Sequence, residues 1–278
     1  MDLSRVSRRY DNDELYDAYT GDFLYKGQFA TYEGGQLDGS FIRRRTVSIA
    51  PELALPPRRV VTLFNEQWVL SDPIVDGFHG KPIRQTMSAR KCHGLYQILT
   101  VEELLNPVQG ARSAYAFCRW VSNTADAATT EYEPFYEFSL SATEESVSQR
   151  FLYDGEKLWH TRMSAEISEG FLFAEADLLT EFLPASQVTV ASPGTIDPVT
   201  LVPSGGPSYT GILVERYMFY RKTDQAQESN YHGDKTLLVA ESSSPAKTGT
   251  VEINGTKWAI LATENIAGGY ALHVRRNG

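Results

Sequence analysis

Three stretches of the chain share one pattern, in which an apolar run, a short polar turn, a tryptophan and a second apolar run follow one another. They read VVTLFNEQWVL (Val60–Leu70), FLYDGEKLWHT (Phe151–Thr161) and VEINGTKWAIL (Val251–Leu261). The chain has only four tryptophans, and three of them, Trp68, Trp159 and Trp258, occupy the same place in this pattern. β-Branched and aromatic runs on both sides of a short turn are typical of β-hairpins. We therefore expect three hairpins, each with its tryptophan as a structural core residue.

The repeat extends beyond the tryptophans. An alanine precedes each one at nearly the same distance (Ala50, Ala142 and Ala240), and a Gly-containing loop with a further β-type run follows each one. Copies about a third of the chain apart indicate tandem domains rather than a solenoid, whose repeats are shorter. The first and third copies agree best, so a two-copy chain with an irregular middle stays open.

The expected fold class is mainly β, with tandem small β-barrel or sandwich domains, two of them clear and a third expected. The expected domains are 1–106, 107–203 as a possible divergent repeat, and 204–278 as a repeat of the first. A few short helices are also expected. Thr100 and Glu103 have the spacing of a capping box ahead of Leu104. We also expect short helices over Asp13–Tyr19 and Ala176–Phe182.

Composition excludes several classes of protein. The chain has 278 residues and a formal net charge of −9, which disfavours broad binding of nucleic acid through its phosphates. No apolar run is long enough to span a bilayer, and the polar N-terminal stretch predicts neither a secretory signal nor a membrane anchor. The two cysteines, Cys92 and Cys118, match no zinc or redox spacing and are expected to be reduced thiols.

The sequence contains no recognisable catalytic motif. A nucleophile elbow, a P-loop, a dinucleotide fingerprint and an H-E-x-x-H helix are all absent, and the five histidines are scattered. Asp72, Asp76 and His79 lie close together in sequence, so a metal-dependent hydrolase remains a minor alternative. We expect no catalytic residue, no cofactor and no bound metal.

Two arginine clusters stand out in this acidic chain: Arg43, Arg44 and Arg45, then Arg58 and Arg59. Arginine is enriched at protein interfaces, where its guanidinium forms bidentate pairs with carboxylates. Strand-flanking arginines are as often simply solvated. We weigh the two interpretations equally and name these five residues as interface candidates.

Residues Ala50–Lys91 resemble the central portion of head-closure (stopper) proteins in the head-to-tail neck of tailed bacteriophages. The resemblance is carried by Arg58-Arg59, the apolar run and turn that follow, Ser71-Asp72-Pro73, Asp76-Gly77, and the strand Ile83–Lys91. Residues 249–276 repeat this arrangement more loosely. The present chain is much longer than the small single-domain proteins of that family.

The resemblance implies a non-enzymatic virion protein that is assembled in the host cytoplasm and forms a homo-oligomeric ring in the neck. Such a ring would retain the genome and join a portal or adaptor protein to tail proteins, without a membrane partner. DNA would pass the lumen without sequence-specific binding, since acidic walls repel its phosphates. A capsid decoration protein or a tail or baseplate protein built from the same barrels is the alternative.

The segment Asp72–Lys81 lies in the best-matched stretch and is expected to form a bent loop. In the family that it resembles, the equivalent loop projects from the barrel and helps to close the channel. We name Ile74, Val75, Phe78 and His79 as channel-loop candidates. Packing of their apolar side chains on the loop's own barrel is the competing interpretation.

Overall fold

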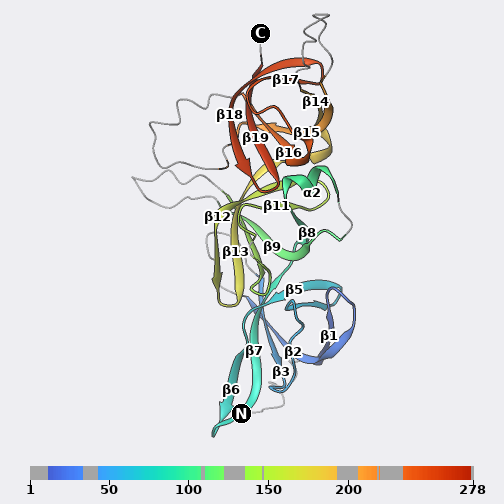
Figure 1. The fold of residues 1–278 in the computed structure, drawn as a ribbon. Helices are drawn as coiled ribbons and strands as arrows, with labels where there is room; N and C mark the ends of the chain where they lie inside the picture. The colour runs from blue at the N-terminus through green and yellow to red at the C-terminus, as the bar shows by residue number, and fades with distance from the viewer. Residues whose placement is uncertain are drawn as a thin grey trace, which may run out of the picture. The chain divides into compact units, whose positions relative to one another are not determined.

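A computed structural model describes residues 12–33, 43–107, 110–121, 135–145, 147–192, 206–217, 219 and 234–276. The fold is mostly β, with three six-stranded barrels in tandem (Figure 1). The predicted fold class is therefore confirmed. Contacts between Cα atoms group the chain into two compact units. Unit 1 comprises Met1–Tyr96, Ala114–Ser146 and Ser164–Glu175, and unit 2 comprises Gln97–Ser113, Val147–Met163 and Ala176–Gly278.

The first barrel contains seven strands, of which six close the barrel and one, β6, pairs only with β7. The strands are β1 (Asn12–Asp17), β2 (Phe23–Glu33), β3 (Arg43–Ile49), β4 (Val60–Leu63), β5 (Glu66–Leu70), β6 (Ile74–Phe78) and β7 (Lys81–Lys91). Their order is β3-β2-β1-β4-β5-β7-β6, and pairing of β3 with β7 closes the barrel. Its interior is an apolar cluster that includes Leu15, Val47, Trp68 and Met87.

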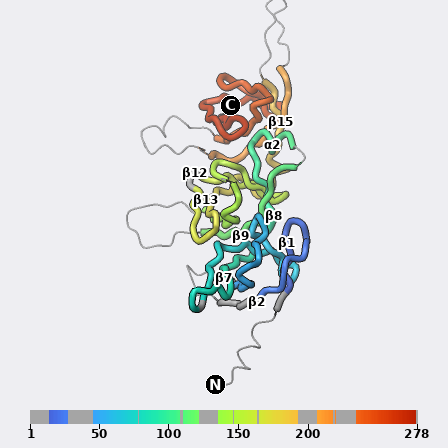
Figure 2. The backbone as a smooth tube through the Cα atoms, turned by 60° about the horizontal axis from the view of Figure 1, so that its bottom comes forward, coloured from blue at the N-terminus to red at the C-terminus, as the bar shows by residue number. Residues whose placement is uncertain are grey.

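The second barrel closes in the order β10-β13-β12-β11-β8-β9. Its elements are β8 (Gly94–Leu99), α2 (Val101–Leu105), β9 (Ser113–Val121), β10 (Phe135–Ser141), β11 (Phe151–Tyr153), β12 (Leu158–Ser168) and β13 (Phe171–Thr180). The short helix α3 (Leu183–Ser186) follows it. The strands β12 and β13 run side by side as a long hairpin (Figures 1 and 2).

The third barrel closes in the order β14-β15-β16-β19-β18-β17. Its elements are β14 (Gln187–Ala191), β15 (Ser208–Glu215), β16 (Lys235–Ala240), the 3₁₀ turn η2 (Glu241–Ser243), β17 (Gly249–Ile253), β18 (Thr256–Ile266) and β19 (Gly269–Arg276). An apolar cluster that includes Val190, Leu237, Val251 and Leu272 fills it.

All three barrels have one topology. When the six closing strands of each barrel are numbered along the chain, the order around the barrel is first, second, third, sixth, fifth, fourth. The middle domain is therefore a repeat of the same fold and not an irregular linker. In the second and third barrels the fifth and sixth strands form a hairpin, whereas in the first barrel β5 and then β6 both pair with β7, so the turn of the corresponding hairpin lies between β6 and β7.

The tryptophan hairpins join the fourth and fifth strands of each barrel, and they share one register. Trp68 pairs with Val61, Trp159 with Leu152 and Trp258 with Val251. The first turn has left-handed backbone at Phe64 and Asn65 (φ 50 and 61), and the third at Asn254 and Gly255 (φ 47 and 77). Such two-residue turns match the twist of the flanking strands. Trp68 and Trp159 are buried (1% and 4% exposed), whereas Trp258 is half-buried against the third core.

One predicted helix is confirmed and two are wrong. The Thr100 side chain accepts from the Glu103 amide while the Glu103 carboxylate accepts from the Thr100 amide, which makes the capping box of α2. Asp13–Tyr19 instead lies mostly in β1, where Leu15 points into the barrel core. Ala176–Phe182 lies mostly in β13. The segment contains one alanine, Ala176, which is buried in the strand, so tertiary packing overrides its helix propensity.

The domain boundaries also differ from those expected. The strand β8 and the helix α2, which we placed in the first domain, follow the last strand of the first barrel, and β8 belongs to the second barrel. The strand β14, which we placed in the middle domain, belongs to the third barrel. The connections between barrels are short, so no Gly- or Pro-rich linker marks them in the sequence.

Candidate assembly interface

The predicted loop Asp72–Lys81 is largely a β-strand. Ile74 pairs with Thr86, Val75 with Gln85 and Asp76 with Arg84, so β6 and the first half of β7 form a hairpin. His79 and Gly80 make its two-residue turn with left-handed backbone (φ 49 and 75). The expectation of a bent loop is therefore wrong. Ladder hydrogen bonds to β7 hold this segment extended, with a register shift between Asp76 and Gly77.

The β6–β7 hairpin carries apolar side chains that its own barrel does not cover. Ile74 is 68% exposed, Val75 56% and Ile83 58%. His79 and Gly80 at the turn are also exposed, and the side chain of Phe78 lies outside the described residues. Among four channel-loop candidates, Ile74, Val75 and His79 are thus exposed. These exposures argue against the interpretation that Ile74 and Val75 pack on their own barrel.

One ion pair crosses the exposed hairpin. Arg84 Nε donates to Asp76 Oδ2 (2.7 Å), and the Thr86 hydroxyl donates to the same oxygen (3.1 Å). These two hydrogen bonds, from Arg84 first and Thr86 second, lower the pKa of Asp76. At the base of the hairpin the Gln85 amide donates to the carbonyl oxygens of Pro51 (2.7 Å) and Leu53 (2.9 Å). The hairpin is therefore anchored at its base and exposed towards its turn.

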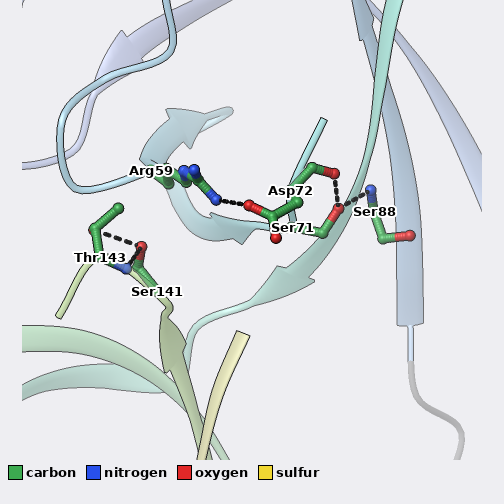
Figure 3. A network of polar contacts seen from close by, with 6 residues as sticks. All are labelled: Arg59, Ser71, Asp72, Ser88, Ser141 and Thr143. Carbon is green, nitrogen blue, oxygen red and sulfur yellow. Dashed lines mark hydrogen bonds and ion pairs between the residues drawn. The ribbon is translucent and has the colours of Figure 1, made fainter. Parts of the chain in front are cut away.

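A polar network fixes the point at which β5 passes into β6 (Figure 3). Arg59 Nη1 donates to the Asp72 carboxylate. The Ser71 hydroxyl accepts from the Ser88 amide (2.9 Å) and donates to the Asp72 carbonyl oxygen (3.0 Å). This network explains why Asp72 marks a break in the strand: its side chain and those of its neighbours replace ladder hydrogen bonds.

Residues of the second barrel pack on this break, within unit 1, and we call these contacts the first junction. The turn Glu169-Gly170 joins β12 to β13, and the Asp72 amide donates to the Glu169 carbonyl oxygen (3.3 Å). A Cβ atom added at Gly170 would lie 2.0 Å from the Asp72 amide nitrogen. Only glycine permits this approach, because backbone meets backbone and Gly170 has φ +79.

Arg58, named as an interface candidate, lies in the first junction. Its Nε and Nη2 atoms approach Glu144 Oε1 (2.8 and 2.7 Å), and its guanidinium lies 3.8 Å from the centroid of the Tyr19 ring. The Glu144 side chain is only 6% exposed. Ser141 and Thr143 bond to each other just before it (2.8 Å between hydroxyls; Figure 3) and form the turn that presents Glu144. Arg58 and Arg59 therefore both have partners inside unit 1.

Arg90 is a buried charge of the first junction (6% exposed). Its guanidinium lies 4.8 Å from the ring centroids of both Phe171 and Phe173, and its Nη1 donates to the Ser139 hydroxyl (2.9 Å). Glu137 lies 4.0 Å away and itself binds Arg119 through two bonds of 2.9 Å. The two aromatic rings and the carboxylate together compensate for desolvation of the arginine.

A second junction lies within unit 2. The turn Ala267-Gly268 joins β18 to β19, and the Val101 amide donates to the Ala267 carbonyl oxygen (2.9 Å). A Cβ atom at Gly268 would lie 2.8 Å from Thr100 Cβ. Glu102 accepts from the Ser242 hydroxyl (2.6 Å) beside this turn. An apolar cluster fills the junction: Leu99, Val101, Leu104, Phe151, Leu158, Leu179, Leu183, Ile212, Val214, Phe219, Leu238 and Ala271.

The second junction also buries a histidine. His160 Nδ1 lies 3.0 Å from the Tyr217 hydroxyl, which donates to Asp177 Oδ2 (2.8 Å), and Arg162 Nη2 donates to Asp177 Oδ1 (2.6 Å). The Phe219 ring packs edge-on against His160. Burial lowers the pKa of His160 to about 4, although Asp177 opposes the shift. The histidine is therefore neutral at physiological pH and acts as a packed core residue.

Over the described part of the chain, no group of three or more His, Cys, Asp or Glu side chains is placed to hold a metal ion. Asp72 and Asp76 instead pair with Arg59 and Arg84. Cys92 and Cys118 form no disulfide, and burial raises the pKa of the Cys92 thiol to about 12. No helix of the described residues is long and apolar enough to cross a membrane.

One group of predicted interface residues stays untested, and one group of junction residues was not predicted. Arg43, Arg44 and Arg45 begin β3, where Arg44 pairs with Arg90 in register, but their side chains lie outside the described residues. Their role as interface residues stays a prediction. The residues of the first junction, Arg90, Phe171 and Phe173, were missed. A signal was present, since Phe171–Ala174 is apolar at every position, a pattern typical of a strand that is covered on both faces.

Comparison of the chain with protein-family models, with curated proteins and with solved structures finds no match.

Proposed function

We propose that the protein is a non-enzymatic structural component of a tailed-phage virion, which forms a homo-oligomeric ring in the head-to-tail neck. The observation that carries the proposal is the β6–β7 hairpin, an exposed apolar element on a six-stranded barrel. It lies in the stretch that resembles head-closure proteins. Three barrels of one topology supply several surfaces, which suits a protein whose work is assembly.

The electrostatics support passage of DNA. A net charge of −9 gives the chain a repulsive potential towards phosphates, so a lumen lined by it would not retain the genome by counterion release. Portal or adaptor and tail proteins are then the axial partners. Retention of DNA is assigned to the hairpin, with Ile74, Val75, Phe78 and His79 as the residues that meet the channel or a neighbouring subunit.

The location is tested by labelling the protein in purified particles from an infected host and imaging them. Label at the vertex between head and tail supports the neck. Label over the capsid surface indicates the decoration protein, and label along the tail or at its tip indicates a tail or baseplate protein. Absence from particles overturns a virion role altogether.

The function of the hairpin is tested by removing it without damage to the barrel. Val75 and Gln85 are cross-strand partners, so residues 76–84 can be replaced by an Asn-Gly turn while the Gln85 anchor is kept. Particles with this change should fill with DNA but lose it or fail to join tails. The control is a variant in which the turn Phe64-Asn65, which is also exposed, is replaced by Asn-Gly. Genomes retained and infectivity unchanged in the hairpin variant would refute the assignment.

A further inference from the structure

In each barrel a hairpin ends the fold, and its turn has a glycine at the same place. The turns are His79-Gly80, Glu169-Gly170 and Ala267-Gly268, and the three glycines share a left-handed backbone with φ of 75, 79 and 79. In two of these barrels the turn packs on another barrel of the chain: Gly170 on Ser71-Asp72, and Gly268 on Thr100. Within this chain, a turn of this kind therefore packs on the surface of a neighbouring barrel.

The first hairpin has the same construction, but among the described residues the space beside its turn glycine is open. A Cβ atom at Gly80 would meet nothing within 4 Å, whereas one at Gly170 or Gly268 would collide with the acceptor. Ile74, Val75 and Ile83 are each more than half exposed on this hairpin. Exposed apolar residues that cluster on one element mark an interaction surface more often than chance.

The third barrel has a matching exposed site. The residue three positions after each hairpin tryptophan is Ser71, Arg162 or Leu261. Ser71 lies under the docked Gly170 turn, and Arg162 binds Asp177 in the network that reaches Tyr217 of the third barrel. Ser71 therefore meets the following barrel directly, whereas Arg162 binds Asp177 of its own barrel, and Asp177 in turn accepts from Tyr217. Leu261 is instead 40% exposed, on a bulge between Ile260 and Ala262.

We propose that the chain self-associates head to tail, with the β6–β7 hairpin of one copy docking on the third barrel of a second copy beside Leu261. The contact is heterologous: a different surface is used on each copy, so it closes into a ring if its rotation closes and extends otherwise. This inference deepens the proposed ring by naming its surfaces and rests on the ring part of that proposal. The neck location is independent of it.

Complementation between two variants tests the proposal. Val75→Glu blocks the hairpin and Leu261→Glu blocks the acceptor, and both residues are exposed, so the fold should survive, as circular dichroism and melting temperature can verify. The full-length wild-type chain is followed by sedimentation velocity up to about 0.5 mM, which detects contacts in the upper micromolar range. Ile167→Glu, at a residue that is 63% exposed and belongs to neither surface, is the matched control.

The wild type and the control should both form species larger than a monomer, and each blocked variant alone should stay monomeric. A mixture of the two blocked variants keeps one intact hairpin and one intact acceptor, so it should form dimers and nothing larger. A monomeric wild type, blocked variants that associate like the wild type, or a mixture that stays monomeric would each overturn the proposal. None of these results bears on where the protein lies in a particle.

Discussion

The β6–β7 hairpin of the first barrel and the β12–β13 hairpin of the second have the same position in the same strand order but opposite surroundings. Both turn through a left-handed glycine, Gly80 and Gly170. Gly170 packs against the backbone of Asp72, and Phe171 beside it is 1% exposed. A Cβ atom added at Gly80 would meet nothing within 4 Å, and Ile83, three residues further along the strand, is 58% exposed. Barrel topology therefore determines the hairpin, while the neighbouring barrel determines what its side chains can be.

The side chains of the two hairpins differ in what their burial or exposure costs. The docked hairpin contributes two phenylalanines, and they surround Arg90, whose burial would be costly without them. The exposed hairpin carries Lys81, Pro82 and the pair Asp76–Arg84 among its apolar residues. Charges and proline on an exposed strand discourage indiscriminate pairing with other chains. The hairpin thus keeps an apolar surface for a specific partner and limits unspecific contacts.

The largest expected effect separates the two hairpins by burial. Phe171→Ala removes a ring that is packed on Arg90 and on the cluster around Val60, Val69 and Cys92, so unit 1 should lose about 3–5 kcal/mol of stability. Ile83→Ala should change it by less than about 0.5 kcal/mol. Denaturant unfolding of both variants measures the contrast. Similar losses for the two would mean that the first hairpin is covered in solution.

The repeat was predictable from sequence because its signal is local. Trp68, Trp159 and Trp258 each follow a turn of a few residues, and the cross-strand register that places them is fixed within the same short stretch. The barrel boundaries were not predictable in this way. The strand β8 begins soon after β7 ends, and nothing in the residues between them distinguishes a turn within a barrel from a connection between barrels. That distinction arises only from long-range strand pairing.

The second contrast compares the two turn glycines directly. Alanine at either position adopts a left-handed backbone at a cost of about 1–2 kcal/mol. At Gly170 the added Cβ must also displace the Asp72 backbone, and overpacking of this kind costs roughly another 1–3 kcal/mol. Gly170→Ala should therefore destabilise the protein clearly more than Gly80→Ala. Thermal melting of the two variants tests this difference. An equal decrease in melting temperature for both would show that the residues around Gly170 rearrange at little energetic cost.

The buried histidine of the second junction should make the stability of the protein depend on pH. His160 in the second junction has a folded pKa of about 4, below the unfolded value of 6.5, so the unfolded chain binds a proton that the folded chain excludes. Its contribution is fully present above pH 6.5 and is lost as the pH falls towards 4. Between pH 7 and pH 5 the loss should be about 2 kcal/mol.

Acid unfolding followed by intrinsic fluorescence tests this dependence. The variant His160→Phe carries no titrating group at that position and should flatten the stability profile between pH 7 and 5, whatever its stability at pH 7. His79→Phe on the exposed hairpin is the matched control and should retain the wild-type slope. An unchanged slope in His160→Phe would assign the acid sensitivity to other groups.

The candidate site was predicted only in part, for a physical reason. Sequence indicated that residues near Ile74 and Val75 are apolar in a polar stretch, and the structure shows them exposed. It could not reveal that Arg58 and Glu144 meet, because they lie far apart in the chain and belong to different barrels. The same holds for Arg90 with Phe171 and Phe173. An arginine cluster read alone does not distinguish an internal junction from a subunit interface.

The smallest expected effect compares two ion pairs. Glu144→Gln removes the charge that faces Arg58 in the first junction, where the carboxylate is 6% exposed, and should cost about 1–2 kcal/mol that added salt screens little. Asp76→Asn removes the partner of Arg84 on the exposed hairpin, where both side chains are largely solvated (43% and 56% exposed). No measurable change in melting temperature is expected there, since solvent replaces the pair. Melting temperatures at low and high salt separate the cases. If Asp76→Asn proved as destabilising as Glu144→Gln, the exposed hairpin would have to be held by contacts that bury this pair, and its contrast with the docked hairpin would fail.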